Sequence, residues 1–245
     1  MIIRHGFSTW NQLNLFTGWV DVELSEIGVA EAKTAGKIIK ESGFVPDVVF
    51  TSVLKRAIDT ANISLSEMEL DNVETFKSWR LNERHYGALT GLDKKETVEK
   101  FGEEQVHLWR RSFDVPPPPM VEGSKYDFSQ DPLYADVPCS LIPKTECLKD
   151  VVARVLPYFE ETIAPRLLKG ENVLVVAHGN SLRALIMLLE KIPSAEIANF
   201  ELPTATSRLY KFDSGFKVES FGYLEDLDKV NKRAQAVKDQ VSTSK

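Results

Sequence analysis

Short apolar runs alternate with longer amphipathic segments along the chain. The apolar runs cover residues 1–3, 47–52, 73–79 and 173–177. Segments with apolar residues at helical spacing cover residues 26–43, 53–68, 145–170 and 181–190. The runs are typical of buried strands, and the amphipathic segments are typical of helices that cover a sheet. The pattern therefore predicts an α/β fold, a three-layer α/β/α arrangement with a mainly parallel central sheet.

Individual residues indicate where these elements begin, bend and end. Ser25 can cap the first long helix by accepting a hydrogen bond from a backbone N–H, and Gly43 is suited to its end. Pro157 lies inside the segment 145–170 and removes a helical hydrogen bond, so we expect a kink there. Only three residues precede Arg4, so the first strand is expected to be short.

The length of 245 residues fits one large α/β unit, and we expect a single domain over residues 1–245. The stretch 113–147 breaks the alternation, because it contains a run of four prolines and little periodicity. It is predicted to be an ordered insertion. Residues 225–245 are polar and rich in lysine, and they are predicted to be a mobile tail with helical tendency.

Composition argues against several classes of protein. Hydrophobic residues make up 43% of the chain and charged residues 27%, which is typical of a globular protein. We expect no membrane segment, because no apolar stretch approaches roughly 20 residues. We expect no signal peptide, because the N-terminus has no basic region followed by an apolar core and a cleavage site of small residues. A net charge of -6 argues against nucleic acid as a partner. The two cysteines form no CxxC pair, which favours a cytoplasmic protein over a disulfide scaffold or a zinc site.

Two His-Gly pairs stand at the ends of predicted strands. The first apolar run is followed by Arg4 and His5, and the strand 173–177 is followed by His178 and Gly179. Ligands of open α/β sheets bind beyond the carboxyl ends of the strands. We therefore expect both pairs at one pocket, with the N-terminus of the next helix pointing towards an anion. Neither pair belongs to a GxGxxG loop or a P-loop.

Arginines recur in settings that favour phosphate binding. Arg56 starts a predicted helix directly after a strand, the segment 79–87 holds two arginines, and Arg110 and Arg111 lie between two aromatic residues. Each alone is typical of a surface ion pair. Together with the two histidines they predict a pocket for a multiply charged, phosphorylated small molecule. A net acidic protein can bind such an anion when positive potential is focused in a cleft.

Six motifs extend this pattern over nearly the whole chain: RHG, FTGWVDVELSE, TSVLKRA, SWRLNERHYGAL, WRRSF and AHGNSLRAL. With these motifs in this order, the chain resembles the cofactor-dependent phosphoglycerate mutases of the histidine phosphatase superfamily. The resemblance implies a glycolytic and gluconeogenic isomerase that interconverts 3-phosphoglycerate and 2-phosphoglycerate through a phosphohistidine. It also implies a cytoplasmic homo-oligomer, a dimer or a tetramer, and 2,3-bisphosphoglycerate as the primer.

The resemblance also implies a role for each matched residue. His5 would be the nucleophile, and Arg4, Arg56 and His178 would surround the transferring phosphoryl group. Glu83 would donate and accept the proton of the substrate hydroxyl. Substrate contacts are implied for Ser8, Asn11, Thr17, Gly18, Arg84, Tyr86, Lys94, Arg110, Arg111, Gly179 and Asn180. Of these, the lysine and the last two arginines would hold the carboxylate and the non-reacting phosphate. No metal is expected, because the four histidines show no HxH or HExxH spacing.

Phe7 is the main departure from the family, which usually has a glutamate after Arg-His-Gly. If that glutamate lies in the arginine network, its loss leaves an arginine less well paired. Two consequences stay open, namely stronger anion binding and a distorted pocket. Ser8 is retained, whereas the related bisphosphoglycerate synthases commonly have glycine there, so the sequence favours a mutase over a synthase.

Two other functions stay open on the sequence alone. One is a histidine phosphatase that acts on another phosphorylated metabolite. The other is a non-catalytic family member that binds phosphorylated ligands or partners. Phe7 and the short first strand favour the second, and the matched catalytic positions argue against it.

Overall fold

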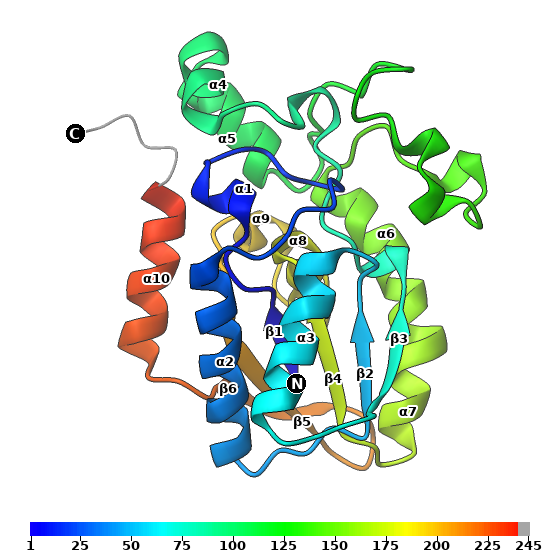
Figure 1. The fold of residues 1–245 in the computed structure, drawn as a ribbon, viewed down its shortest axis with the longest axis vertical. Helices are drawn as coiled ribbons and strands as arrows, with labels where there is room; N and C mark the ends of the chain where they lie inside the picture. Colours follow the sequence, from blue (N-terminus) through cyan, green and yellow to red (C-terminus); the bar gives the residue numbers. More distant parts are fainter. Residues whose placement is uncertain (240–245) are drawn as a thin grey trace.

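The computed structural model describes residues 1–239 and shows, within them, a six-stranded sheet covered by helices on both faces (Figure 1). The strands are β1 Ile2–Arg4, β2 Val48–Thr51, β3 Glu74–Lys77, β4 Val173–Ala177, β5 Ser207–Phe212 and β6 Val218–Tyr223. Their order in the sheet is β3-β2-β4-β1-β5-β6. Strands β1 to β4 pair in parallel, and β5 and β6 are added in antiparallel pairing. The expected α/β fold with a mainly parallel sheet is confirmed.

Helices of unequal length connect the strands. They are α1 Thr9–Gln12, α2 Glu26–Glu41, α3 Lys55–Glu67, α4 Lys94–Phe101, α5 Glu103–Arg111, α6 Leu148–Tyr158, α7 Ala164–Leu168, α8 Gly179–Glu190, α9 Ser194–Ile197 and α10 Leu227–Asp239. Short 3-10 turns cover Trp79–Leu81, Gly87–Leu89, Phe128–Gln130, Pro132–Tyr134 and Cys139–Leu141. Helices α2 and α3 pack together on one side of the sheet, and α6 and α8 pack together on the other (Figure 1).

The hydrophobic core lies on both faces of the sheet. Ile2 packs in a cluster that includes residues of α6 and α8, whereas Ile3 packs in a second cluster with residues of α2 and α3. Neighbouring strand residues point to opposite faces, so a strand between two helical layers is apolar at every position. All five residues of β4 are buried for this reason. The first strand is three residues long, as expected.

The helix ends follow the local chemistry of the chain. Ser25 caps α2 by accepting a hydrogen bond from the Gly28 N–H at 3.2 Å, and Gly43 follows the helix with a φ of 76°, a left-handed conformation that favours glycine. Helix α6 continues past Pro157 to Tyr158, and the irregularity comes later, as a π-helical turn over Phe159–Ile163. This turn lies just before Pro165, which has no N–H to donate.

The insertion and the tail contain ordered elements. Phe128 and Tyr134 of the insertion are buried against Trp19, with ring centroids 6.3 and 4.8 Å away from that of the indole. Helix α10, which lies within the predicted tail, runs beside α2 (Figure 1). Residues 240–245 of that tail lie outside the described residues. The antiparallel strands β5 and β6 were not predicted from the pattern.

Candidate active site

The two histidines that follow strands lie side by side at the carboxyl edge of the sheet. Strands β1 and β4 are neighbours, with Arg4 opposite Ala177, and the N–H of His5 donates to the carbonyl of Ala177 at 2.9 Å. The rings of His5 and His178 have centroids 4.9 Å apart. The two strand ends lie together, as expected, because β1 and β4 are neighbouring parallel strands.

His5 is held in one tautomer by its own loop. Its Nδ1 lies 2.7 Å from the carbonyl oxygen of Gly6, which can only accept, so Nδ1 carries the proton and Nε2 keeps a lone pair. Burial and the adjacent Arg56 and Arg4 lower the pKa of His5 well below its ordinary value, so the ring is neutral at neutral pH. A neutral imidazole with a free lone pair is the form that can attack phosphorus.

His178 is buried behind His5 and is also neutral. Burial, followed by Arg56 and His5, lowers its pKa well below the ordinary value. Its Nε2 lies 2.7 Å from Ser52 Oγ. That hydroxyl accepts from the N–H of Leu54 at 3.2 Å, and Nε2 is the only hydrogen-bond acceptor that its own proton reaches among the described residues, so Ser52 donates to Nε2. The proton of His178 then sits on Nδ1, which has no hydrogen-bond partner among the described residues.

Two arginines flank His5. Arg56, in the first turn of α3, is 1% exposed and donates to the carbonyl oxygens of Val20 and Gly18 at 2.8 and 2.7 Å. Burial lowers its pKa to about 10, so it remains a cation. Arg4 donates from Nη1 to the carbonyl of Leu202 at 2.6 Å, whereas its buried Nε has no partner among the described residues. Such an unpaired buried donor is suited to a charged ligand.

Glu83 is fixed by three hydrogen bonds to one of its oxygens. Its Oε1 accepts from the Arg84 N–H at 2.7 Å, from the Asn180 N–H at 3.1 Å and from Asn180 Nδ2 at 2.8 Å. Gly179 lies between Glu83 and Arg4, because a methyl group on that residue would be 3.5 Å from Glu83 Oε2 and from Arg4 Cζ. The carboxylate is therefore held beside the arginine with Oε2 left for another partner.

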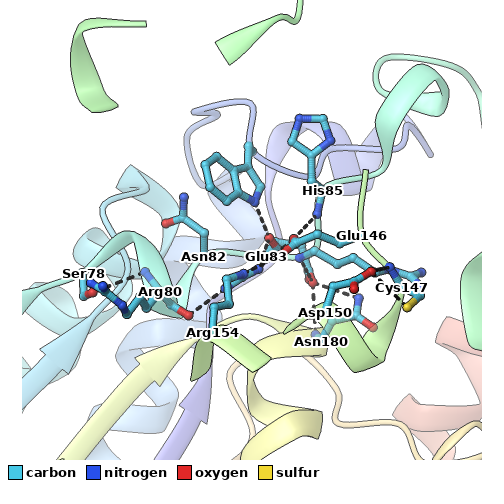
Figure 2. Close-up of polar contacts among 12 residues, drawn as sticks. Ser78, Arg80, Asn82, Glu83, His85, Glu146, Cys147, Asp150, Arg154 and Asn180 are labelled. Carbon is cyan, nitrogen blue, oxygen red and sulfur yellow. Dashed lines mark hydrogen bonds and ion pairs between the residues drawn. The ribbon is translucent and has the colours of Figure 1, made fainter. Parts of the chain in front are cut away.

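A buried ion pair supports the loop of Glu83 from behind. The carbonyl of Glu83 accepts from Trp19 Nε1 at 2.7 Å and from Arg154 Nη2 at 3.0 Å. Figure 2 shows Arg154 held in turn by Glu146, at 2.6 Å from Nε to Oε1, while Oε2 of the same carboxylate accepts from the His85 N–H at 2.8 Å. Because every group in this network has a partner, the loop is fixed on both sides of Glu83.

A second group of cations lies on α4 and α5, across the cavity from the histidines. Burial, together with Arg110 and Arg4, lowers the pKa of Lys94 to about 7. Arg84 supports this group, since its Nη2 donates to the carbonyl of Arg110 at 2.8 Å and its guanidinium lies 4.8 Å above the Tyr86 ring. The lowered pKa of Lys94 thus reflects its burial first and the neighbouring guanidinium groups second.

One cavity brings the expected residues together. It is lined by Arg4, His5, Ser8, Asn11, Thr17, Gly18, Arg56, Glu83, Tyr86, Lys94, Arg110, Arg111, Gly179 and Asn180. His178 and Arg84 do not line it, and each lies directly behind a residue that does. Ser8 and Asn11 form the N-terminal cap of α1, where Ser8 Oγ accepts from the Asn11 N–H at 3.1 Å. The cavity is rich in donors and poor in acceptors, which suits a polyanion.

Comparison with known proteins agrees with this geometry. The family model of the histidine phosphatase superfamily (branch 1) matches residues 1–131 and 130–223. A 2,3-bisphosphoglycerate-dependent phosphoglycerate mutase of Leifsonia xyli subsp. xyli is 56% identical over 92% of this chain and 90% of its own length. A protein of the same name from Treponema denticola is 50% identical over 98% of this chain and 97% of its own.

The chain belongs to the 2,3-bisphosphoglycerate-dependent phosphoglycerate mutases of the histidine phosphatase superfamily.

The fold is shared more widely than the sequence. The solved structure of a mycobacterial glucosyl-3-phosphoglycerate phosphatase is 24% identical, with a TM-score of 0.65, over 91% of this chain and 94% of that one. Within residues 1–239 of this mutase, no helix is long and apolar enough to span a membrane. The same residues contain no group of three or more His, Cys, Asp or Glu side chains that could hold a metal ion.

Sequence reasoning missed several residues in and around this cavity. Glu201 and Arg183 line the cavity, and Ser52 sets the tautomer of His178. Arg183 stands within the AHGNSLRAL motif, which could have indicated it, whereas Glu201 lies in a stretch with no strand or helix pattern. The supporting pair of Arg154 and Glu146 gave no signal either, because nothing local marks an ion pair that reaches back to the loop of Glu83.

Phe7 lies outside the cavity of His5. Its N–H donates to Glu31 Oε2 at 2.8 Å, and its carbonyl accepts from the Ser25 N–H at 2.9 Å. Its side chain lines a neighbouring cavity that also includes Arg4 and residues of α10. Arg4, which lines both cavities, has a carboxylate partner from a distant part of the chain, because its Nη1 lies 3.0 Å from Glu201 Oε1.

Proposed function

We propose that this protein interconverts 3-phosphoglycerate and 2-phosphoglycerate through a phosphohistidine on His5. The observation that carries the proposal is the setting of that ring, which is neutral, fixed by the carbonyl of Gly6 and placed between Arg4 and Arg56 in a cavity of cations. Relatives that are 50% and 56% identical carry the name of a 2,3-bisphosphoglycerate-dependent phosphoglycerate mutase, which supports the same reaction here.

The histidines and arginines would carry out the phosphoryl transfer. The lone pair of His5 Nε2 forms a bond to phosphorus while the bond from phosphorus to the donor oxygen breaks. Arg4 and Arg56 would stabilise charge on the equatorial oxygens, and the Nδ1 proton of His178 would be a neutral donor from the ring beside His5. Because these groups are already fixed by protein contacts, little reorganisation is needed in the transition state.

Glu83 would move the proton. When a substrate hydroxyl attacks the phosphohistidine, its proton passes to the Oε2 atom that the fixed carboxylate leaves available. In the reverse direction the same acid protonates the leaving oxygen. Lys94, Arg110 and Arg111 would bind the carboxylate and the phosphate that does not react, and Arg84 would keep Arg110 in place.

The same residues fit 2,3-bisphosphoglycerate as the primer. Arg4 and Arg183 line the cavity, and each keeps a buried guanidinium nitrogen that has no partner among the described residues; such donors suit a ligand with two phosphates and a carboxylate. When bound, the primer supplies the phosphoryl group that charges His5. Charge stabilisation by fixed arginines makes a metal unnecessary for this step, and we propose a reaction without one.

The proposal extends to partners and location. A small phosphorylated substrate is the partner that the cavity fits. The two cysteines, Cys139 and Cys147, are free, which is compatible with a reducing cytoplasm. A homo-oligomer, dimer or tetramer, remains a prediction from the family.

Turnover of 3-phosphoglycerate tests the proposed function. The purified chain, primed with 2,3-bisphosphoglycerate, is assayed for 2-phosphoglycerate beside a panel of other phosphate esters. We expect turnover of 3-phosphoglycerate to exceed hydrolysis of every ester in the panel. Faster hydrolysis of another ester would instead identify a histidine phosphatase, and binding of 3-phosphoglycerate without turnover of any ester would identify a non-catalytic member.

A further inference from the structure

One carboxylate joins the two halves of the cation cavity. Glu201 Oε1 lies 3.0 Å from Nη1 of Arg4, at the phosphoryl end, and Glu201 Oε2 accepts from Nη1 of Arg111, at the far end. The side chain of Glu201 is 7% exposed, and those of its two partners are 11% and 12% exposed. Each oxygen therefore serves one arginine, and the bridge is shielded from water.

The bridge determines which donors remain for a ligand. Arg4 uses Nη1 for Glu201 and for the Leu202 carbonyl, at 2.6 Å, while its buried Nε has no partner among the described residues. With one end of the guanidinium fixed, its plane is fixed, and the free Nε is presented beside Gly179 at the floor of the cavity. A guanidinium held only by the carbonyl of Leu202 could still rotate about that one hydrogen bond, and the direction of its Nε donor would not be fixed.

The bridge also balances charge. Arg111 lies close to Arg110 and Arg183. Burial lowers the pKa of each of these two side chains to about 10, and the charge of Arg111 contributes to both shifts. Burial opposes ionisation of Glu201, but Arg111 and Arg4 outweigh it and hold the pKa of this carboxyl below its usual value. Glu201 is therefore an anion within a group of cations, and it favours their charged forms.

Arg4 receives its carboxylate from Glu201 and not from residue 7. Residue 7, where the family usually has glutamate, is Phe7 here, and its side chain shares a cavity with Arg4. No carboxylate can reach the arginine from that position. We propose that Glu201 is a positioning residue of the phosphoryl-transfer site, which takes over at Arg4 the acidic partner missing at position 7 and ties Arg4 to Arg111.

This inference rests on the proposed function. It predicts that loss of the Glu201 charge lowers kcat without raising KM. In the Glu201→Gln variant the side chain keeps its shape but loses its charge, and it can accept from only one of the two arginines. We expect kcat for 3-phosphoglycerate to fall about 10- to 100-fold, because Arg4 loses its fixed orientation. We expect KM not to rise, because the cavity becomes more positive.

The variant Glu190→Gln is the matched control. Glu190 accepts from Arg208 Nε and Nη2 at 2.7 and 2.8 Å, in an ion pair whose side chains are 7% and 8% exposed. It resembles the Glu201 bridge in burial but lies at the far end of α8 from the cavity. We expect a lower Tm with kcat unchanged. A kcat unchanged in Glu201→Gln, or a KM that rises as much as kcat falls, would overturn the proposal.

Phe7→Glu tests whether the two positions share one role. In the Glu201→Gln background, the new carboxylate beside Arg4 is expected to restore kcat several-fold above that of the single variant. In the wild-type background it adds a second negative charge, so KM is expected to rise. A double variant no faster than Glu201→Gln would show that position 7 cannot supply this partner and would overturn that part of the proposal.

Labelling of His5 separates this inference from the proposed function. The rate of phosphohistidine formation is measured with 2,3-bisphosphoglycerate and with p-nitrophenyl phosphate. If the wild type is labelled but does not turn over 3-phosphoglycerate, the proposed function fails while the role of Glu201 is still tested by the labelling rate. We expect that rate to fall about 10- to 100-fold in Glu201→Gln, and an unchanged rate would contradict the inference.

Discussion

The ring centroids of His5 and His178 lie 4.9 Å apart, and the two planes are inclined by 56°. Both imidazoles are neutral, because burial and then the nearby Arg56 lower both pKa values. One ring keeps a lone pair on Nε2, and the other keeps a proton on an unpartnered Nδ1. Two adjacent strand ends thus bring together one imidazole with a free lone pair and a second imidazole with a proton to donate, which is the pair that the proposed phosphoryl transfer requires.

Ser52 is expected to act through His178. Substitution Ser52→Ala removes the proton donor to Nε2, so the ring can place its own proton there and lose the donor on Nδ1. We expect kcat to fall about 5- to 10-fold, the effect of one hydrogen bond, with little change in KM. The comparison is Ser64→Ala, since Ser64 is buried on α3 and donates to the carbonyl of Ala32 at 3.1 Å. A loss of kcat as large in that variant would point to general destabilisation.

Lys94 is expected to give the reaction a pH dependence. Its pKa in the free protein is about 7, so the side chain is a cation below that pH and becomes neutral above it. Because the cation binds an anionic substrate, kcat/KM should decline as pH rises through 7. In Lys94→Gln we expect kcat/KM at pH 6 to fall about 10- to 100-fold, the effect of a hydrogen bond to a charged group.

The pH profile of that variant checks the assignment. Without Lys94 the decline of kcat/KM near pH 7 should disappear, while the rise at lower pH that belongs to substrate ionisation should remain. Persistence of the same decline in Lys94→Gln would assign it to another group.

Glu146 is expected to matter for both stability and rate. Glu146→Gln leaves the buried Arg154 without its counterion, which costs about 3 kcal/mol of the free energy of unfolding. For a chain of this size that loss corresponds to a Tm lower by roughly 10 °C. Because Arg154 also donates to the carbonyl of Glu83, kcat should fall more than KM changes.

Thermal unfolding and kinetics of the same preparation test this prediction. Glu122→Gln provides the comparison, because the pair of Glu122 with Lys144 is exposed and should leave Tm and kcat unchanged. Equal values of Tm for Glu146→Gln and the wild type would contradict the role of the buried pair.

The parallel core and the positions of the histidines could be predicted from sequence because their signals are local. A strand covered on both faces is apolar throughout, as in Val173–Ala177, and the residue that follows it lies at the ligand edge of the sheet. The cap at Ser25 is local too. Strand β5 was missed because one of its buried positions is Arg208, whose charge is balanced by Glu190 of α8. A charged residue at a buried position interrupts the alternation of apolar and polar residues by which a strand is recognised.

The rest of the site depends on contacts between distant parts of the chain. Glu201 is 197 residues away from Arg4 and 90 away from Arg111. Arg154 is 71 residues away from Glu83. No periodicity records such pairs, since each depends on how whole elements pack. A resemblance in motifs located the cations, and the structure was needed to find the anion that holds two of them.

Phosphate transfer to His5 tests the central claim most directly. The wild type is incubated with labelled 2,3-bisphosphoglycerate and analysed for phosphate that is lost in acid and retained in base, with His5→Asn as the control. We predict about one such phosphate per chain in the wild type, located on His5, and none in the variant. A folded wild type that takes up no label, or a variant labelled to the same extent, would contradict the account.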